Sequence, residues 1–259
     1  MLEIRNVNYE IAGIKILDSV SAFFEPGKLS VIIGPNGSGK STLLKIISHE
    51  ISHYTGEVHY ENILLRTLIS AQLARKRAVL SQHSELSFPL TVEEVVMMGR
   101  YPHFTYKPGS NDWLILKQVL ELMDIEQLRY RNYLTLSGGE KQKTHFARVL
   151  AQIWTQPEKG YRYLLLDEPI AFMDLNYQHE FMRIAKRMAL ANTLVVAVIH
   201  DLNLALQYAD KVVALNKGNV IANGVPEQVI TPELIYNLYG MKSRIVTDQH
   251  LPFPMLVAG

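Results

Sequence analysis

The sequence predicts an α/β fold, and three features of its 259 residues carry that prediction. The motif GPNGSGKS, at residues 34–41, joins the continuous apolar run Leu29–Ile33 to a segment, Ser41–Ile47, whose apolar spacing is that of a helix. The segment LLLDEP, at residues 164–169, is a second apolar run that stops at two carboxylates, and a third run follows at Thr193–Ile199. Continuous apolar runs of this kind are typical of strands in a sheet that is covered on both faces.

The other elements can be placed in order along the chain. Residues 2–33 carry β-type apolar patches that are interrupted by Gly13 and by the turn signal EPGK at residues 25–28, which indicates short strands. The middle third has mostly the apolar spacing of helices. Beyond the glycine-rich motif we expect a strand at 78–82, helices at 92–98, 113–123, 124–129 and 138–154, strands at 163–167 and 193–199 with a helix at 178–191 between them, a hairpin at 212–222, and from Thr231 a helix followed by proline-rich coil.

The composition excludes several classes of function. Hydrophobic residues make up 48% of the chain and charged residues 20%, as in an ordinary globular protein. The net charge of +1 creates no strong field for nucleic acid, and the absence of cysteine excludes disulfides, thiolate metal sites and a cysteine nucleophile. We find no signal-peptide pattern and no apolar run near the ~20 residues of a membrane span, so we expect the chain by itself to be soluble.

The motif GPNGSGKS fits a phosphate-binding loop, G-x-x-x-x-G-K-[ST], at every constrained position. Its glycines let backbone N–H groups turn inward, and the helix that follows adds the positive end of its dipole. In this pattern Lys40 reaches the β- and γ-phosphates of a nucleotide, and the Ser41 hydroxyl ligates Mg²⁺. The residues expected to hold ATP here are Gly34, Pro35, Asn36, Gly37, Ser38, Gly39, Lys40, Ser41 and Thr42.

The pair Asp167–Glu168 ends the apolar run of LLLDEP. At the end of a buried strand, Asp167 is placed to hold the hydration shell of a metal ion, and Glu168 is placed to polarise an attacking water. Taken alone, LLLDEP is equally well explained as a strand that runs into a capped turn. Downstream of a phosphate-binding loop the catalytic interpretation is favoured, so we expect ATP hydrolysis with Glu168 as the catalytic carboxylate.

The motif LSGGE, at residues 136–140, has two interpretations. Ser137 and Glu140 form a capping box that is sufficient to start the next helix. The same geometry places the Ser137 hydroxyl and the backbone N–H groups of Gly138 and Gly139 at a helix N-terminus, where an anion can bind. Two glycines weaken the start of a helix, which is explained if a phosphate must approach the backbone closely. The motif alone leaves both interpretations open.

Together, GPNGSGKST, LSGGE, LLLDEP and the later VVAVIHDLN resemble the ATP-binding subunits of ABC transporters, from Leu2 to about Gly240. The resemblance implies a P-loop NTPase core of the RecA-like type, with an N-terminal antiparallel β subdomain and an inserted α-helical subdomain. It also implies an ATPase domain at residues 1–240, with the helical insertion at about 88–155, and a C-terminal tail at 241–259.

The resemblance assigns roles to further residues. Gln82 is similar to the glutamine that contacts Mg²⁺ and senses the membrane partner, and His200 to the switch histidine at the γ-phosphate. Asp174 resembles the aspartate that links two active sites across a dimer, and Tyr9 the aromatic residue that stacks on adenine. In this family two copies bind two ATP molecules head to tail. Each ATP would lie on the phosphate-binding loop of one copy and be covered by Ser137, Gly138, Gly139 and Glu140 of the other.

Within the family, MMGRYPHF at residues 97–104 resembles importers of the iron-siderophore, heme and vitamin B12 type. Glu140 in place of the common glutamine, together with the polar insertion before YLLLDEP, looks most like the hemin-import group. The chain also departs from the family pattern without losing a catalytic group, and the change beside Asp174 could alter how tightly the two sites couple. The departures are Ile170 for threonine, Phe172-Met173 for Ala-Leu, and Lys143 for arginine.

The function implied by the resemblance is ATP-driven import of heme or a related iron complex, with ATP and Mg²⁺ as cofactors. The implied partners are a second copy of the chain, a polytopic permease dimer and a substrate-binding protein, at the cytoplasmic side of the cell inner membrane. The histidines lack the spacing of a metal site, so we expect no direct binding of heme to this chain. Since the net charge is only +1, we expect no nucleic acid partner either. Import of ferric siderophores or cobalamin is the alternative cargo. There are two alternative classes of protein. The first is an ABC ATPase that acts on DNA or ribosomes, which is disfavoured because sustained heptads are absent. The second is a P-loop phosphotransferase, which is disfavoured because it has no use for LSGGE.

Overall fold

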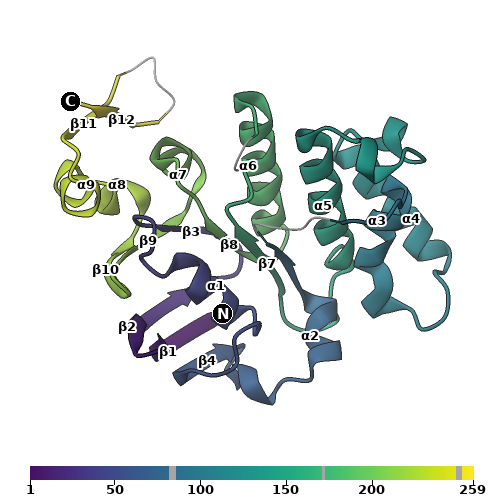
Figure 1. Cartoon of the computed structure of the whole chain (residues 1–259), viewed down its shortest axis with the longest axis horizontal. Coiled ribbons are helices and arrows are strands. Elements are labelled where there is room, and N and C mark those ends of the chain that lie inside the picture. The colour runs from purple at the N-terminus through teal and green to yellow at the C-terminus, as the bar shows by residue number, and fades with distance from the viewer. Residues whose placement is uncertain (82–85, 171–172, 249–252) are drawn as a thin grey trace.

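The computed structural model describes residues 1–81, 86–170, 173–248 and 253–259 of the chain. A six-stranded sheet in the order β10-β9-β3-β8-β7-β6 forms its centre (Figure 1). Neighbouring strands run parallel except for β10, which is antiparallel to β9. The strands are β3 (Leu29–Ile33), β6 (Arg77–Leu80), β7 (Arg162–Asp167), β8 (Thr193–Val198), β9 (Lys211–Asn216) and β10 (Asn219–Gly224). The predicted α/β class is confirmed.

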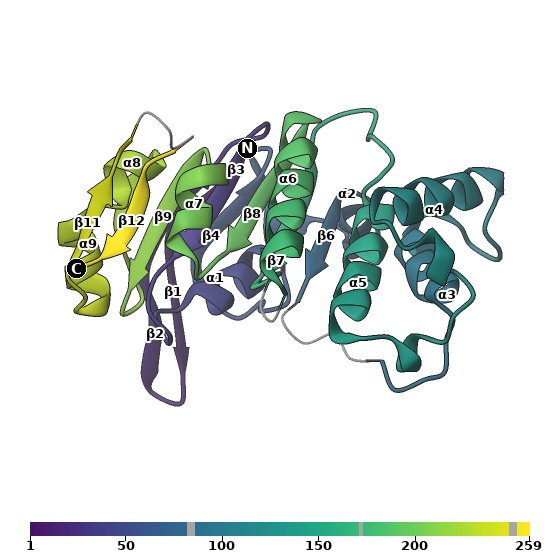
Figure 2. The ribbon, with the colours of Figure 1, turned by 90° about the horizontal axis from the view of Figure 1, so that it is seen from above.

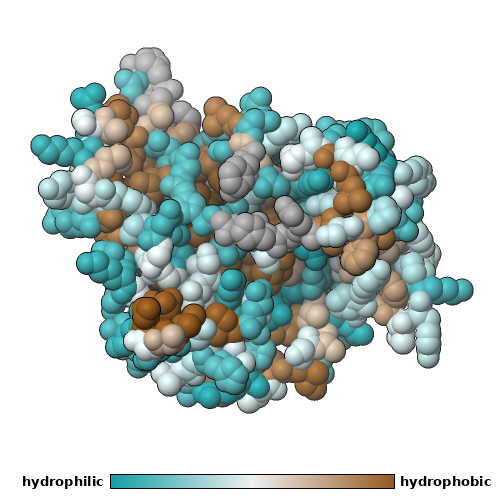
Figure 3. Space-filling view, viewed as in Figure 1, coloured by the Kyte–Doolittle hydropathy of each residue, from teal (hydrophilic) through white to brown (hydrophobic). Residues whose placement is uncertain are grey.

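A second, antiparallel sheet has the order β2-β1-β4-β5 and lies below the central sheet in Figure 1. Its strands are β1 (Leu2–Ile11), β2 (Ile14–Phe24), β4 (Thr55–Tyr60) and β5 (Ile63–Leu64). The hairpin of β1 and β2 exposes Ile11 and Ile14 at its tip, and Figure 3 shows hydrophobic side chains gathered at the lower left, over this region. The expected antiparallel β subdomain is therefore present.

Helices cover both faces of the central sheet, as its apolar strands require. In Figures 1 and 2, α6 and α7 lie over one face and α1 over the other, while α3, α4 and α5 form a helical group at one end of the molecule. Among the described residues no helix is long and apolar enough to cross a membrane. The α-helices are α1 (Lys40–Ile47), α2 (Ser70–Lys76), α3 (Val92–Met97), α4 (Ser110–Leu122), α5 (Gly138–Gln152), α6 (Leu175–Leu190), α7 (Leu202–Tyr208), α8 (Pro226–Val229) and α9 (Pro232–Tyr239), and the 3₁₀ helices are Leu65–Thr67, Met98–His103, Glu126–Leu128 and Tyr133–Thr135.

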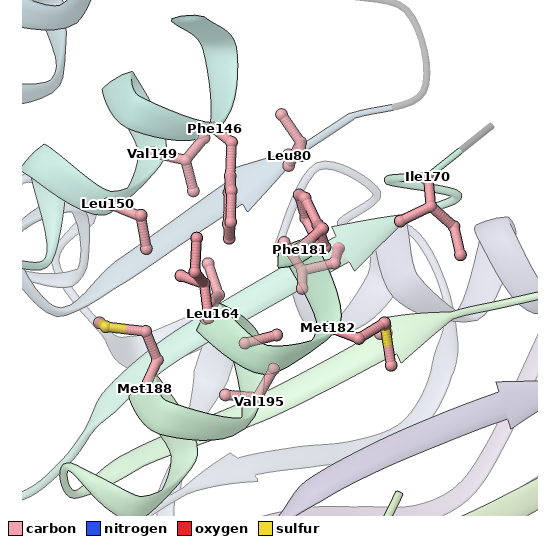
Figure 4. Packing of buried hydrophobic residues seen from close by; sticks show 14 of the residues in the cluster. Leu80, Phe146, Val149, Leu150, Leu164, Ile170, Phe181, Met182, Met188 and Val195 are labelled. Atoms are coloured by element: carbon pink, nitrogen blue, oxygen red, sulfur yellow. The ribbon is translucent and has the colours of Figure 1, made fainter. Parts of the chain in front are cut away.

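Alternate residues of the central strands enter two hydrophobic clusters. Val31 belongs to the cluster that contains residues of α5 and α6, whereas Ile32 belongs to the cluster that contains residues of α1 and the antiparallel sheet. The larger cluster also ties the helical group to the sheet (Figure 4), because Phe146 of α5 stacks on Phe181 of α6 with ring centroids 3.9 Å apart. Such pairs contribute about 0.5–1.5 kcal/mol beyond their buried area. The helix that LSGGE begins is thus packed firmly onto the core.

Two predicted elements are wrong. The expected helix at 124–129 is reduced to the 3₁₀ turn Glu126–Leu128, because α4 ends where Asp124 takes a positive φ of 51°. The N–H of Ile125 then bonds the carbonyl of Leu120 at 3.0 Å, which closes the helix end. The expected C-terminal coil instead contains two paired strands, β11 (Ser243–Val246) and β12 (Met255–Ala258).

The sequence prediction also missed α2, α7, α8, β4 and β5. The helix expected at 178–191 begins three residues earlier, at Leu175, because the side chain of Asp174 caps it by accepting from the Tyr177 N–H at 3.0 Å. Tyr101, Pro102 and His103 belong to the 3₁₀ helix Met98–His103. These differences are at short elements or element ends, where apolar spacing carries little information.

Candidate functional site

The glycine-rich loop between β3 and α1 is shaped so that only glycine fits at two positions. Gly34 has a φ of 150° and Gly39 a φ of 99°. A Cβ atom on Gly34 would lie 2.2 Å from the Leu215 carbonyl oxygen, and one on Gly39 would lie 2.7 Å from a methyl carbon of Leu17. The backbone is therefore held against β2 and β9, and its N–H groups can face an anion at the start of α1.

A second layer of backbone supports this loop. The N–H of Gly218, in the turn between β9 and β10, donates to the Ser38 carbonyl at 3.1 Å, and the Asp18 N–H donates to the Gly218 carbonyl at 2.9 Å. Burial raises the pKa of Tyr239, at the end of α9, and a hydrogen bond with the Gly34 backbone opposes that shift. Sequence reasoning found neither support, since both join segments far apart along the chain.

Lys40 lies inside the loop with only 5% of its surface exposed. Its ammonium group donates to the carbonyl oxygens of Gly34 and Pro35, each at 2.9 Å. Burial lowers the pKa of Lys40, whereas the nearby carboxylates of Glu168 and Asp167 favour its charged form. A buried cation beside inward-facing N–H groups is suited to bind phosphate.

Asp167 ends β7 directly opposite α1, and the Ser41 hydroxyl donates to its Oδ1 at 3.0 Å. Burial raises the pKa of Asp167, the hydrogen bond from Ser41 lowers it, and the negative charge of Glu168 raises it. A hydroxyl and a carboxylate are the oxygen ligands that Mg²⁺ prefers. A divalent cation at this point would offset the cost of the buried carboxylate, so the two residues fit a magnesium ion.

Glu168 and His200 form a close side-chain pair that the sequence did not predict. His200 Nε2 lies 2.7 Å from Glu168 Oε1, with side chains 45% and 16% exposed. Glu168 has a positive φ of 48°. For a residue with a Cβ this conformation costs about 1–3 kcal/mol, and such strain gathers at functional sites. The contact arises because β7 and β8 are adjacent, so the residues after them meet at one edge of the sheet.

LSGGE forms the predicted capping box. The Ser137 hydroxyl accepts from the Glu140 N–H at 3.3 Å, and Glu140 Oε2 accepts from the Ser137 N–H at 2.7 Å. A Cβ on Gly138 or Gly139 would have no atom within 4 Å, so nothing in the described chain requires glycine there. Figures 1 and 2 show α5 and α1 in different parts of the molecule. The structure therefore does not bring LSGGE to the phosphate-binding loop of the same chain.

The turn before LSGGE is anchored by a buried pair that sequence reasoning missed. The Tyr133 hydroxyl lies 2.7 Å from His145 Nε2, and the Tyr133 N–H donates to the Leu90 carbonyl at 2.7 Å. Tyr133 is 2% exposed and His145 7% exposed. The pair fixes residues 133–136 to both α5 and the segment before α3, so the position of LSGGE is set by the helical group as a whole.

His145 leads to a prediction about stability. Burial lowers the pKa of His145 to about 4, and the positive charge of Arg148 adds to the shift. In the unfolded chain the pKa of His145 returns to ~6.5. Between pH ~6.5 and ~4 the unfolded state therefore binds more protons than the folded state, and the free energy of unfolding decreases as the pH is lowered. Between these limits we expect a loss approaching about 3 kcal/mol, measured by urea unfolding. His145→Gln should flatten this dependence; equal slopes for both proteins would contradict the assignment.

The remaining predicted residues vary in how they are placed. Gln82 and Phe172 lie outside the described residues. Tyr9, on β1, is partly buried and lines a hollow with Lys15, His53 and Tyr54. Asp174 caps α6 as described above. Ile170 and Met173 are buried in the core cluster.

Lys143, one of the departures from the family pattern, joins two helices. Its ammonium lies 4.1 Å from the centre of the Tyr177 ring and 3.8 Å from Glu180 Oε2, both on α6. Since the Tyr177 N–H also bonds Asp174, the helix after LSGGE and the cap of α6 are connected through one tyrosine. An ion pair and a cation–π contact of this type contribute about 0.5–2 kcal/mol.

Comparison with known proteins agrees with this geometry. The ABC transporter family model matches residues 17–171. The hemin import ATP-binding protein of Gloeobacter violaceus is 41% identical over 257 residues, which are 99% of this chain and 94% of that protein. A chain from a transporter assigned to the metal-chelate type, solved facing inward, has a TM-score of 0.82 at 24% identity and covers 100% of this chain and 97% of its own. A bacterial ABC transporter cassette solved as a dimer has a TM-score of 0.75 at 26% identity, over 87% of this chain and 99% of that one.

Proposed function

The chain belongs to the ABC transporter family, as an ATP-binding subunit with ATPase activity. From this premise we propose that it energises the uptake of hemin or a related iron complex. The observation that carries the proposal is the 41% identity over nearly the full chain to a protein named for hemin import. Ferric-siderophore and cobalamin uptake are the neighbouring possibilities, because the ATPase chemistry described here does not depend on the cargo.

We propose that the working form is a dimer with two ATP molecules at its interface. Each nucleotide lies on Gly34–Thr42 of one copy and is covered by Ser137–Glu140 of the other. Three observations support this arrangement: the open space around Gly138 and Gly139, the separation of α5 from α1, and the dimeric state of a cassette 26% identical to this chain. A helix N-terminus with two glycines lets phosphate oxygens approach backbone N–H groups closely.

The residues of the site then have distinct tasks. Lys40 and the loop N–H groups bind the phosphates, and Tyr9 stacks on adenine. Ser41 and Asp167 hold Mg²⁺, which neutralises phosphate charge when bound, with Gln82 as a further ligand. Glu168 accepts the proton of the attacking water, and His200 holds that carboxylate in place while facing the γ-phosphate. Asp174 connects the two sites across the interface.

The energy of ATP binding closes the dimer and hydrolysis reopens it, which makes the interface a two-state element. We propose that residues 82–104 transmit this motion to a permease dimer at the cytoplasmic side of the inner membrane, and that a substrate-binding protein delivers the cargo. Hemin itself is not expected to touch this chain.

The cargo can be tested by reconstituting the ATPase with its co-purified permease in lipid vesicles and measuring uptake of labelled hemin, cyanocobalamin and a ferric siderophore from the binding protein. We expect ATP-dependent hemin uptake well above the other two, and none with Glu168→Gln. Uptake of cobalamin or ferric siderophore in preference to hemin would overturn the cargo, while ATP hydrolysis without uptake of any of the three would overturn the importer assignment.

A further inference from the structure

The C-terminal hairpin is attached to the helix that follows His200. The side-chain amide of Asn203 makes two hydrogen bonds to one backbone position of β12. Asn203 Nδ2 donates to the Leu256 carbonyl at 3.2 Å, and the Leu256 N–H donates to Asn203 Oδ1 at 2.8 Å. The amide group therefore pairs with β12 as a neighbouring strand would.

The position of Leu256 in its hairpin explains why this backbone is available. Leu256 is paired with Ile245 of β11, and in an antiparallel ladder a residue turns both its N–H and its carbonyl either toward the partner strand or away from it. Both groups of Leu256 bond Asn203, so they point away from β11. Leu256 is 9% exposed and belongs to the main core cluster, which anchors the hairpin to the core.

The connection between Asn203 and His200 is short. β8 ends at Val198 and α7 begins at Leu202, so only Ile199, His200 and Asp201 lie between the two elements. The N–H of Ile199 bonds the Ile32 carbonyl at 3.3 Å, which fixes one end of this loop. At the other end, Asp201 Oδ1 accepts from the N–H groups of Asn203 and Leu204, at 2.8 and 3.0 Å. The place of α7 therefore determines the place of the His200 backbone.

We propose that Asn203 is a positioning residue for ATP hydrolysis, through which the C-terminal hairpin holds the His200 loop at the γ-phosphate. The His200 side chain is 45% exposed and extends to Glu168, so surrounding side chains do not enclose it, and its backbone must supply the precision. The hairpin supports the His200 loop, Ile199–Asp201, through α7 and touches no reacting group. This inference rests on the proposed function, in which His200 faces the γ-phosphate.

The test compares Asn203→Ala with wild type for ATP turnover and for the affinities of AMP-PNP, which carries a γ-phosphate, and ADP, which does not. A displaced His200 should lower kcat about ten- to hundredfold, because misplacing a catalytic group by ~1 Å can cost about 100-fold in rate. It should also reduce the preference for AMP-PNP over ADP, while the affinity for ADP stays within about twofold of wild type. A structural role alone would leave the ratio of the two affinities unchanged. Asn111→Ala, at an exposed position of α4, is the matched control.

A second pair of variants breaks the same link from the hairpin. Leu256→Pro removes the N–H that Asn203 accepts, whereas Leu256→Val keeps it. Leu256→Pro should reproduce the kinetic change, Leu256→Val should not, and Asn203→Ala with Leu256→Pro should be no worse than either alone. If Asn203→Ala unfolds, Asn203→Asp, which keeps only the acceptor, should give an intermediate change in a folded protein.

His200→Ala separates the two levels of the argument. If His200→Ala keeps wild-type turnover, the proposed role of His200 is wrong. The other outcome is that His200→Ala is inactive, while Asn203→Ala and Leu256→Pro fold and keep the turnover and nucleotide preference of wild type. In that case the positioning role of Asn203 is wrong and the proposed function stands.

Discussion

Glu168→Gln is expected to leave ATP binding intact and to lower ATP turnover by at least about 100-fold, in the range lost when a general base is removed. Glutamine keeps the size of the side chain and can still bond His200, but it cannot accept a proton from water. Because hydrolysis is what reopens the closed interface, ATP should hold this variant as a dimer. Phosphate release at steady state and size-exclusion chromatography with ATP measure the two effects.

The matched control is Glu158→Gln, which removes the same charge from an exposed position between α5 and β7. It should hydrolyse ATP at the wild-type rate and stay monomeric under conditions that trap Glu168→Gln. Near-wild-type turnover of Glu168→Gln in the presence of its permease would show that the catalytic carboxylate has been misassigned. Loss of ATP binding in that variant would instead indicate that the change disturbs the strained backbone at residue 168.

The sequence was most informative where a local pattern and a chemical requirement coincide. The phosphate-binding loop, the strand that ends at Asp167 and the capping box of Ser137 and Glu140 could each be predicted, because a few adjacent residues determine them. The sequence assigned Ser41 and Asp167 separately to one magnesium ion, and the structure adds that the two side chains are hydrogen-bonded to each other. Their roles with bound nucleotide remain predictions.

What the sequence could not provide is the order of strands and the contacts between distant segments. Nothing in the apolar spacing says that β7 and β8 are neighbours, so the pairing of Glu168 with His200 was not foreseen. The C-terminal strands are four residues each, near Pro252 and Pro254, and their short apolar patterns read as coil. Asn203 is a common residue at the start of a helix, and only its partner 53 positions away makes it informative.

Glycines gave a different kind of information. At Gly34 and Gly39 the structure supplies the reason for glycine within the chain itself, through close approaches to Leu215 and Leu17. At Gly138 and Gly139 it supplies none, because the space around them is open. Glycine at a helix start weakens the helix, so the close approach of a group outside the described chain would explain its presence there. The proposed dimer supplies such a group, the phosphates of ATP bound to the second copy.

Lys40→Ala is expected to weaken the binding of ATP and of ADP by about 2–5 kcal/mol, which is roughly 30- to 5,000-fold. The Lys40 ammonium is buried and shared between two loop carbonyls, so its removal leaves both acceptors without that donor and takes a cation away from the proposed phosphate site. Because ADP keeps the β-phosphate, its affinity should fall as well. Isothermal calorimetry with each nucleotide measures the loss.

Lys40→Met distinguishes charge from packing, because it keeps the aliphatic stem in the loop and removes only the cation. If the charge binds phosphate, Met and Ala should weaken both nucleotides to a similar extent, while Lys107→Ala, at an exposed position before α4, should bind as wild type does. If Met restores wild-type affinity, the side chain serves only to fill the loop. Unchanged nucleotide affinity in Lys40→Ala would show that Lys40 does not bind the phosphates. The main reason to place the phosphates on this loop would then be lost.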